Sequence, residues 1–316
     1  MNSQQGRNLD ARPVWVTGAG GLIGAELVRQ AALGIRGIGA RVIPITRSEL
    51  DLTDGRAVRE RFARDRPKVV IHCAGLTRGP QCEVEPALAR RLNVDVTRGL
   101  AALTADAGAV LVFFSTDLLF DGRKGGYTEQ DEPNPRGVYA ETKREGELAT
   151  LEHPRHIVLR TTLNYGRSPT GDRSFNEDMV RAVAAGRRLK LFTDEFRTPI
   201  PWVATARATW DLVMNGLMDE GGAWGSARPA PSGVFHVAGA DRLSRWEIGE
   251  IVAELHPELR GAMEPGSIAD YDGPPRPADS SMRCERIRPW LTAPLPGFRA
   301  WVGEAVAATR DAAPRP

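Results

Sequence analysis

Short apolar runs alternate with segments of helical spacing along the first half of the chain. The runs lie at residues 13–17, 41–46, 68–73, 110–115 and 156–161. Polar residues do not alternate with the apolar ones inside them, which is typical of strands buried on both faces. Between the runs, apolar residues recur at helical spacing over 22–32, 54–64, 86–107 and 139–151. The alternation predicts an α/β fold with a doubly wound parallel sheet, and Pro44 predicts an edge position for the second strand.

The second half is less regular and predicts a smaller, mixed α/β part. Helical spacing extends over 175–186, 204–217 and 245–255, and short strand-like runs stand at 189–192 and 234–237. Residues 221–233 are rich in Gly, Ala and Pro, which predicts a loop. Residues 264–282 contain several prolines and few apolar residues, so we expect an ordered loop or a lid there.

The composition excludes several classes of protein. Among 316 residues, 42 Lys and Arg stand against 40 Asp and Glu, and a net charge of +2 argues against a protein that coats nucleic acid. Three cysteines exclude a disulfide scaffold and fit a reducing cytoplasm. No apolar run reaches the roughly 18 residues of a membrane helix, and the polar N-terminus lacks the apolar core of a signal peptide. No Cys or His pair has the spacing of a metal site, so we expect no metal.

A glycine-rich segment follows the first strand and opens the first helix, and it reads Thr17-Gly18-Ala19-Gly20-Gly21-Leu22-Ile23-Gly24. In this context Gly18 allows a tight turn, Gly21 lets the backbone approach a pyrophosphate, and Gly24 lets the helix pack closely on the sheet. The start of the helix, at Leu22 and Ile23, then directs free N–H groups and a positive dipole end at the phosphates. The segment therefore predicts a dinucleotide site.

The end of the second strand bears on which dinucleotide is bound. Proteins that bind NAD place an Asp or Glu there, about 20 residues past the glycines, whereas this chain has Arg47 followed by Ser48. A guanidinium suits a 2′-phosphate, which favours NADP(H) and leaves NAD(H) possible. The alternative is that Arg47 is a solvated surface residue. Asp51 and Leu52 stand where the next turn can contact the adenine ring.

Tyr139 and Lys143 stand four residues apart at the start of a predicted helix, which puts the phenol and the ammonium on one face. A phenol with a pKa of about 10 is a poor acid–base group at neutral pH, and a nearby ammonium lowers that pKa. Ser115 and Thr116 end a buried strand, where a hydroxyl can hydrogen-bond a substrate carbonyl. Together with the glycine-rich segment, these residues predict an enzyme that acts on a carbonyl with a dinucleotide cofactor.

These motifs resemble those of the extended short-chain dehydrogenases/reductases. The segment TGAGGLIG (17–24) is similar to the family's TGxxGxxG, and YAETK (139–143) is similar to its YxxxK. More narrowly, the chain resembles the dTDP-4-dehydrorhamnose reductases and their relatives in STDLLFDG (115–122), LRTTLNYG (159–166) and PRPADSSM (275–282).

The resemblance implies a Rossmann domain with a smaller substrate domain. We expect a loose leader at 1–12, a dinucleotide-binding domain at 13–166 with returning segments around 196–240, substrate-binding parts at 167–195 and 241–310, and a tail at 311–316. The resemblance also implies a homodimer formed through the helices at 86–107 and 139–151.

The resemblance assigns catalytic roles to Thr116, Tyr139 and Lys143. It adds further cofactor contacts, namely Ala74, Gly75 and Thr77 in the turn after a central strand, Asn93 in the long helix, and Ser115. The residues expected at the substrate are Thr116, Asp117, Leu163, Asn164, Arg197 and Arg276. Arginine suits the geometry of a diphosphate. Leu163 stands where the family has Trp, and residues 194–202 differ from its DQxGxPT-like loop, so the substrate itself stays open.

The implied reaction is NADPH-dependent reduction of a keto group, on a nucleotide-linked 4-keto-6-deoxysugar or a similar keto compound, with Tyr139 as proton donor. One alternative is an NAD-dependent sugar-nucleotide epimerase or dehydratase, although Leu118 stands where dehydratases carry a carboxylate. The other is a non-catalytic NADP-binding regulatory subunit, similar to the β subunit of methionine adenosyltransferase. Both Tyr139 and Lys143 are present, which argues against this second alternative.

Overall fold

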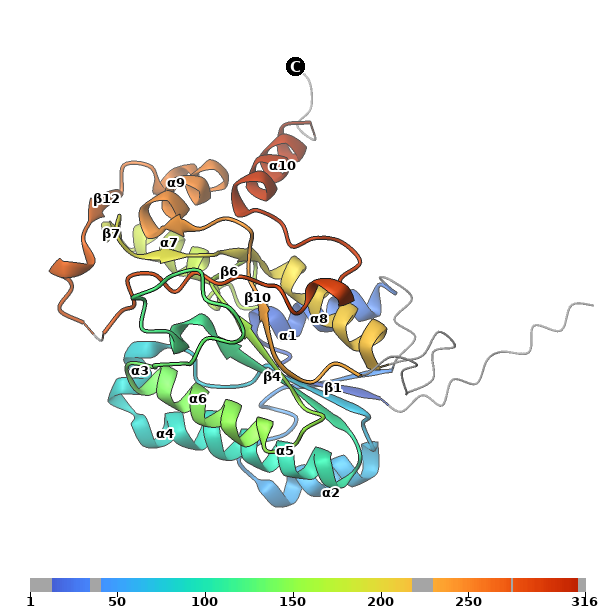
Figure 1. Ribbon diagram of the computed structural model, residues 1–316. Helices are drawn as coiled ribbons and strands as arrows, with labels where there is room; N and C mark the ends of the chain where they lie inside the picture. The colour runs from blue at the N-terminus through green and yellow to red at the C-terminus, as the bar shows by residue number, and fades with distance from the viewer. Residues whose placement is uncertain (1–12, 35–40, 218–229, 274, 312–316) are drawn as a thin grey trace, which may run out of the picture.

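Six parallel strands form the central sheet of the computed structural model, which describes residues 13–34, 41–217, 230–273 and 275–311 (Figure 1). Their order is β10-β5-β4-β3-β1-β2. The bounds are β1 Val14–Thr17, β2 Val42–Ile45, β3 Val69–His72, β4 Val110–Thr116, β5 Ile157–Thr161 and β10 Gly233–Val237. The predicted doubly wound parallel sheet is confirmed, and β2 with Pro44 lies at the edge as predicted.

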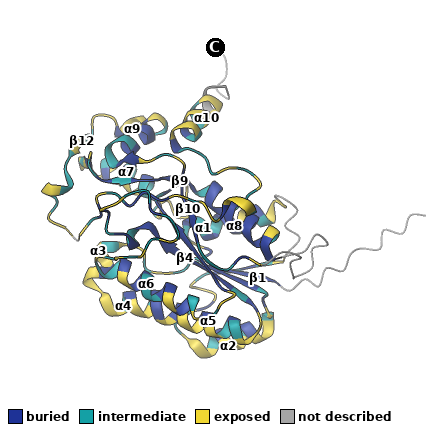
Figure 2. Cartoon of the chain, in the orientation of Figure 1, coloured by how far each residue is buried: buried dark blue, intermediate teal, exposed yellow. Residues whose placement is uncertain are grey.

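Helices cover both faces of the sheet and enclose two separate cores. One face carries α2 Gly55–Asp65, α4 Pro86–Arg90, α5 Val96–Asp106 and α6 Val138–Leu151, and the other carries α1 Leu22–Ala32 and α8 Trp202–Leu217 (Figure 1). Alternate residues of each strand face opposite cores, so Trp15 packs with Phe62 of α2 while Val16 packs on the side of α8. The inner strands of the sheet are mostly dark blue, and so buried, in Figure 2, and each large apolar side chain buried this way contributes roughly 1.5–3 kcal/mol.

The long helix predicted at 86–107 is interrupted by one π-helical turn, Arg91–Asp95, between α4 and α5. Such turns contain one extra residue and are frequent at functional sites. Asn93, which the sequence assigned to the site, lies in this turn and is buried.

A third core lies in the smaller part of the molecule, above the sheet in Figure 1. It contains α7 Phe175–Ala184, α9 Arg245–Leu255 and α10 Phe298–Asp311, together with β7 Leu189–Phe192 paired with β12 Met263–Gly266. Ser174 and Ser244 begin α7 and α9 with reciprocal capping boxes, which fix where these helices start. Two further pairs are β8 Phe196–Arg197 with β11 Leu243–Ser244, and β6 Asn164–Tyr165 with β9 Ile200–Pro201.

Several elements differ from the prediction. The sequence did not predict α3 Gly79–Val84 or α10. The segment expected as a loop at 264–282 begins inside strand β12, and its last residue, Met282, forms a β-bridge with Tyr127. The short 3₁₀ turns are Asp117–Leu119, Pro257–Leu259, Ile268–Asp270 and Arg288–Trp290. The expected leader, most of the expected tail and much of the glycine-rich loop at 221–233 lie outside the described residues.

Two features are absent from the described part of the chain. None of its helices is long and apolar enough to cross a membrane. None of its His, Cys, Asp and Glu side chains gather in groups of three or more that could hold a metal ion.

Candidate active site

The glycine turn after β1 forms a cradle that side chains would fill. Gly18 has a φ of +67°, and a Cβ there would lie 2.7 Å from the amide nitrogen of Ala74. A Cβ on Gly24 would lie 2.3 Å from the carbonyl oxygen of Gly18, so this glycine makes room within the turn itself and not only against the sheet. Gly21 is the N-cap of α1 and makes no side-chain capping bond, which leaves the helix N-terminus open to an anion. The turn therefore fits a pyrophosphate.

The residues that follow β2 lie at the surface. Arg47 and Ser48 are exposed, and Arg47 enters no ion pair with the residues that the structure describes. The carboxylate of Asp51 accepts hydrogen bonds from the amide and hydroxyl of Thr53, which lower its pKa. Leu52 packs at the border of the core beside α2. The exposed guanidinium of Arg47, which also interacts electrostatically with Asp51, fits a 2′-phosphate.

Asn93 ties the turn after β3 to α6. Its Oδ1 accepts a hydrogen bond from the amide of Leu76 at 2.7 Å, and its Nδ2 donates to the carbonyl of Leu76 and to the hydroxyl of Thr142. A Cβ on Gly75 would lie 2.8 Å from Asn93 Oδ1, so the glycine allows this contact. Asn93 thus holds the predicted cofactor turn in place from behind, while Gly75 and Thr77 stay exposed.

Thr116, Tyr139 and Lys143 come together at the carboxyl end of β4. Thr116 ends β4 and Tyr139 stands at the start of α6, and Thr116 makes a hydrogen bond with the Tyr139 phenol. Lys143 is buried one turn further along α6, donates to the carbonyl of Phe114 and lies 4.0 Å above the centre of the Phe113 ring. The Ser115 hydroxyl is buried and has no hydrogen-bond partner among the described residues.

The pKa of Tyr139 is shifted in the direction opposite to the one predicted. Burial raises the pKa of Tyr139 to about 12, and the hydrogen bond from Thr116 opposes this only in part. Burial also lowers the pKa of Lys143 to about 8, against the pull of Glu147. The expectation that Lys143 lowers the pKa of Tyr139 was wrong here, because the Lys143 ammonium contacts Phe114 and Phe113. A phenol with a raised pKa is fully protonated at neutral pH and can donate its proton.

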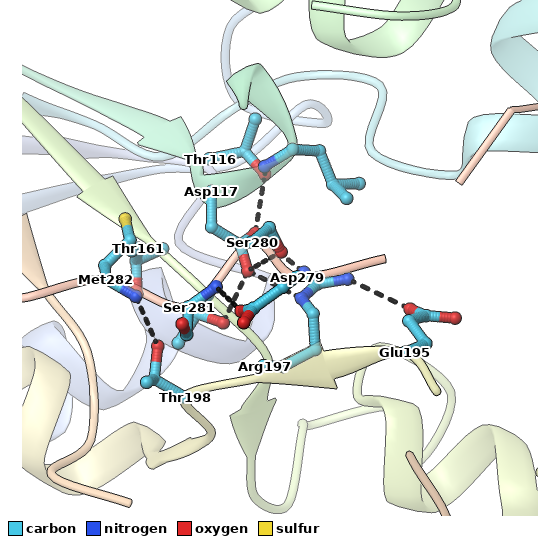
Figure 3. A network of polar contacts seen from close by, with 12 residues as sticks. Thr116, Asp117, Thr161, Glu195, Arg197, Thr198, Asp279, Ser280, Ser281 and Met282 are labelled. Carbon is cyan, nitrogen blue, oxygen red and sulfur yellow. Dashed lines mark hydrogen bonds and ion pairs between the residues drawn. The ribbon is translucent and has the colours of Figure 1, made fainter. Parts of the chain in front are cut away.

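Asp117 lies at the centre of a buried polar network, which Figure 3 shows. The Nε of Arg197 donates to Asp117 Oδ2 and its Nη2 donates to Oδ1, both at 2.6 Å. The hydroxyls of Thr162 and Ser280 donate to the same carboxylate. Asp117 has no exposed surface and its oxygens are occupied, so the predicted contact of Asp117 with substrate does not fit this structure.

A small cavity of about 120 Å³ opens beside Tyr139. Its lining includes Leu118, Tyr139, Glu195, Arg197, Tyr271 and Arg276. Arg276 is already paired with Glu195, at 2.7 and 3.0 Å, and Arg197 is paired with Asp117. Both arginines thus reach the predicted place, but neither carries an uncompensated charge for a diphosphate.

Two predicted substrate residues lie away from this cavity. Leu163 packs against the third core, and the Asn164 amide is used by Thr161, Thr162 and Thr205. Glu195 and Tyr271 were missed, because neither belongs to a motif and both approach the site from segments far along the chain. Glu83 was also missed; its carboxylate accepts a hydrogen bond from the amide of Val138 and caps α6, and it lines the cavity.

A doubly wound sheet whose glycine turn and Tyr139–Lys143 pair lie at the same edge defines the class of extended short-chain dehydrogenases/reductases, which are NAD(P)-dependent oxidoreductases. Within that class, the chain belongs to the RmlD substrate binding domain family, whose model matches residues 12–310.

Known proteins similar to this chain include two reductases and one enzyme subunit. A dTDP-4-dehydrorhamnose reductase of Streptomyces griseus is 38% identical over 71% of this chain and 70% of its own length. A probable dTDP-4,6-dihydroxy-2-methyloxan-3-one 4-ketoreductase of Streptomyces antibioticus is 34% identical, with coverage of 92% and 93%. The methionine adenosyltransferase 2 subunit beta of Bos taurus is 28% identical, with coverage of 95% and 88%. Among solved structures, a dTDP-4-dehydrorhamnose reductase of Clostridium acetobutylicum matches with a TM-score of 0.78, 27% identity and coverage of 94% and 99%.

Proposed function

We propose that this protein reduces the keto group of a nucleotide-linked 4-keto-6-deoxysugar with NADPH. The observation that carries the proposal is the hydrogen bond between Thr116 and the Tyr139 phenol, which lines the cavity, with Lys143 buried one turn further along α6. The two reductases that resemble the chain at more than 30% identity act, by their names, on dTDP-linked keto compounds.

The residues of the chain support a division of roles. The glycine turn and the open start of α1 suit the pyrophosphate of NADPH, and Arg47 suits its 2′-phosphate. When bound, NADPH supplies the hydride for the carbonyl carbon. The Tyr139 phenol, protonated at neutral pH, donates its proton to the carbonyl oxygen. Thr116 hydrogen-bonds and orients that oxygen, and the buried Lys143 binds the carbonyl of Phe114 near the end of β4.

Replacing Tyr139 by Phe tests this assignment. The Tyr139→Phe protein should bind NADPH as the parent does, while NADPH oxidation with dTDP-4-keto-6-deoxyglucose should fall by about 10²–10⁴-fold, the usual effect of losing a general acid. Tyr127→Phe is the matched control, because the Tyr127 hydroxyl bonds Asp121 outside the cavity. Turnover by Tyr139→Phe equal to that of Tyr127→Phe would refute the proton-donor role.

The similarity to the methionine adenosyltransferase subunit supports a second candidate, a regulatory subunit that binds NADP. Affinity purification from cells would distinguish the two. A partner enzyme in equal amount, together with no turnover of any dTDP-keto sugar, would favour the subunit. The dehydratase alternative is weaker, because the apolar Leu118 lines the cavity beside Tyr139.

We also propose a homodimer in the cytoplasm. The helices α5 and α6 pack side by side on one face of the sheet, and Leu148 of α6 is 49% exposed there, which suits a contact with a second copy. The three cysteines are unpaired, as in a reducing compartment. Light scattering on the eluting protein would test the dimer, since the mass of one chain would contradict it.

A further inference from the structure

Arg197 and Asp117 form a buried ion pair next to Thr116 (Figure 3). The guanidinium comes from β8 in the smaller part of the molecule, and the carboxylate follows Thr116 at the end of β4. Both side chains are almost fully buried, and the two hydrogen bonds between them are parallel and short. Such bidentate pairs have a fixed geometry, and leaving one partner alone costs far more than the pair contributes.

The pair controls what the Thr116 hydroxyl can do. This hydroxyl accepts a hydrogen bond from the amide of Leu118 and donates a long one, of 3.3 Å, to Asp117 Oδ1. Arg197 already occupies that oxygen at 2.6 Å. Without the guanidinium, Asp117 would be a stronger acceptor and would hold more tightly the hydroxyl hydrogen that a substrate carbonyl needs. The guanidinium thus keeps Thr116 available.

The pair also sets the charge that faces Tyr139. The carboxylate of Asp117 opposes a phenolate at Tyr139, and the guanidinium of Arg197 offsets it. The other ionisable groups around Tyr139 do not replace Arg197, because Arg276 is paired with Glu195 and Lys143 contacts Phe114. The titratable and charged groups that face Tyr139 or its cavity are Cys82, Glu83, Asp117, Arg136, Lys143, Glu195, Arg197, Tyr271 and Arg276.

We propose that Arg197 is a positioning residue, which neutralises Asp117 so that the Thr116 hydroxyl and the Tyr139 phenol face the substrate carbonyl instead of an uncompensated carboxylate. The catalytic part of this inference rests on the proposed function. Its electrostatic part does not, because the ionisation of Tyr139 can be measured without substrate.

The test follows the titration of Tyr139 by ¹⁹F NMR of protein labelled with 3-fluorotyrosine, since fluorination lowers phenol pKa values into an accessible range. The chain has four tyrosines, and the spectrum of Tyr139→Phe identifies the signal. In Arg197→Gln we expect the pKa of Tyr139 to rise by about one unit, as for loss of a neighbouring opposite charge. In Asp117→Asn it should fall. In the double variant it should return close to the parent value.

The opposite signs separate this role from a merely structural one. If Arg197→Gln does not fold, the fall of the Tyr139 pKa in Asp117→Asn and its return to the parent value in the double variant still test the proposal. Arg197→Lys keeps the charge and should keep the Tyr139 titration near that of the parent. An unchanged pKa of Tyr139 in folded Arg197→Gln, or a rise in Asp117→Asn, would overturn the proposal.

A kinetic measurement checks the catalytic part. Turnover by Arg197→Gln should show a kcat at least about 10-fold lower with KM little changed, and the double variant should recover part of the loss. A fall confined to KM would overturn the catalytic part. A parent protein without keto-reductase activity would refute the proposed function alone and leave the titration interpretable.

Discussion

Gly18 offers a sharp test of the cofactor cradle. Replacing it by Ala puts a side chain on a residue with a φ of +67°, which costs roughly 1–2 kcal/mol for an L residue. The new Cβ would lie 2.7 Å from the amide nitrogen and 3.0 Å from the Cα of Ala74. Both atoms are backbone, so relief requires the turn after β1 to move away from the turn after β3.

The magnitude follows from these two costs. Adding roughly 1–3 kcal/mol for overpacking, we expect Gly18→Ala to lose about 2–5 kcal/mol in total. For a protein of this size that loss corresponds to a fall in melting temperature of roughly 3–8 °C. If half of this cost, about 1–2.5 kcal/mol, arises only when NADPH binds, NADPH affinity drops by about 5- to 70-fold, since 1.4 kcal/mol is a factor of ten.

Gly20→Ala is the matched control in the same turn. A Cβ on Gly20 would meet no atom within 4 Å, and the residue does not have a positive φ. We expect a change within about ±0.5 kcal/mol. Thermal unfolding and NADPH fluorescence titration of both variants are the assays. Equal melting temperatures and equal NADPH affinities for the two variants would refute the reasoning.

Three further predictions concern buried charge. Because burial lowers the pKa of Lys143 to about 8, kcat/KM for keto reduction should decline above that pH, and a profile flat to about pH 10 would contradict a role for the ammonium. Glu147→Gln breaks the buried pair with Arg160 and should lower the free energy of unfolding by about 3–5 kcal/mol in urea titrations, whereas a loss below about 1 kcal/mol would show that the pair is dispensable. Burial lowers the pKa of His72 and His236 to about 3, below the unfolded value of about 6.5, so the unfolded chain binds protons first as the pH falls. Stability should therefore be lost below about pH 6.5, by up to about 1.4 kcal/mol per pH unit for each histidine. Unfolding free energies measured at two acidic pH values check this slope, and equal values at both would refute the prediction.

Much of the fold follows from local pattern. Runs such as 110–115 lack polar–apolar alternation because both faces of the strand are covered. Pro44 has no backbone N–H to donate, so it is placed in an edge strand. Both features could therefore be predicted from the sequence. Irregular turns within a helix leave a weaker signal in the sequence. The π turn around Asn93 has the composition of an ordinary helix, and only its contact with Leu76 distinguishes it.

The candidate site divides in the same way. Thr116, Tyr139 and Lys143 stand in short motifs, so their positions were predictable from spacing. The direction of the Tyr139 pKa was not, because it depends on how deeply the phenol is buried and on where the Lys143 ammonium points. The pairing of Arg197 with Asp117 joins residues 80 apart, and no local pattern records such a contact.

The partners of Asp117 also determine when the site comes into existence during synthesis. Arg197 and Ser280 follow Asp117 by 80 and 163 residues. At roughly 5–20 residues per second on the ribosome, several seconds pass between the appearance of Asp117 and that of its counter-ion. During that interval a nascent chain can form the first strands and the glycine turn while its carboxylate stays in water. We therefore expect fragments that end before Arg197 to keep a cofactor-binding turn without an ordered Thr116, so that catalysis begins only when the chain is nearly complete.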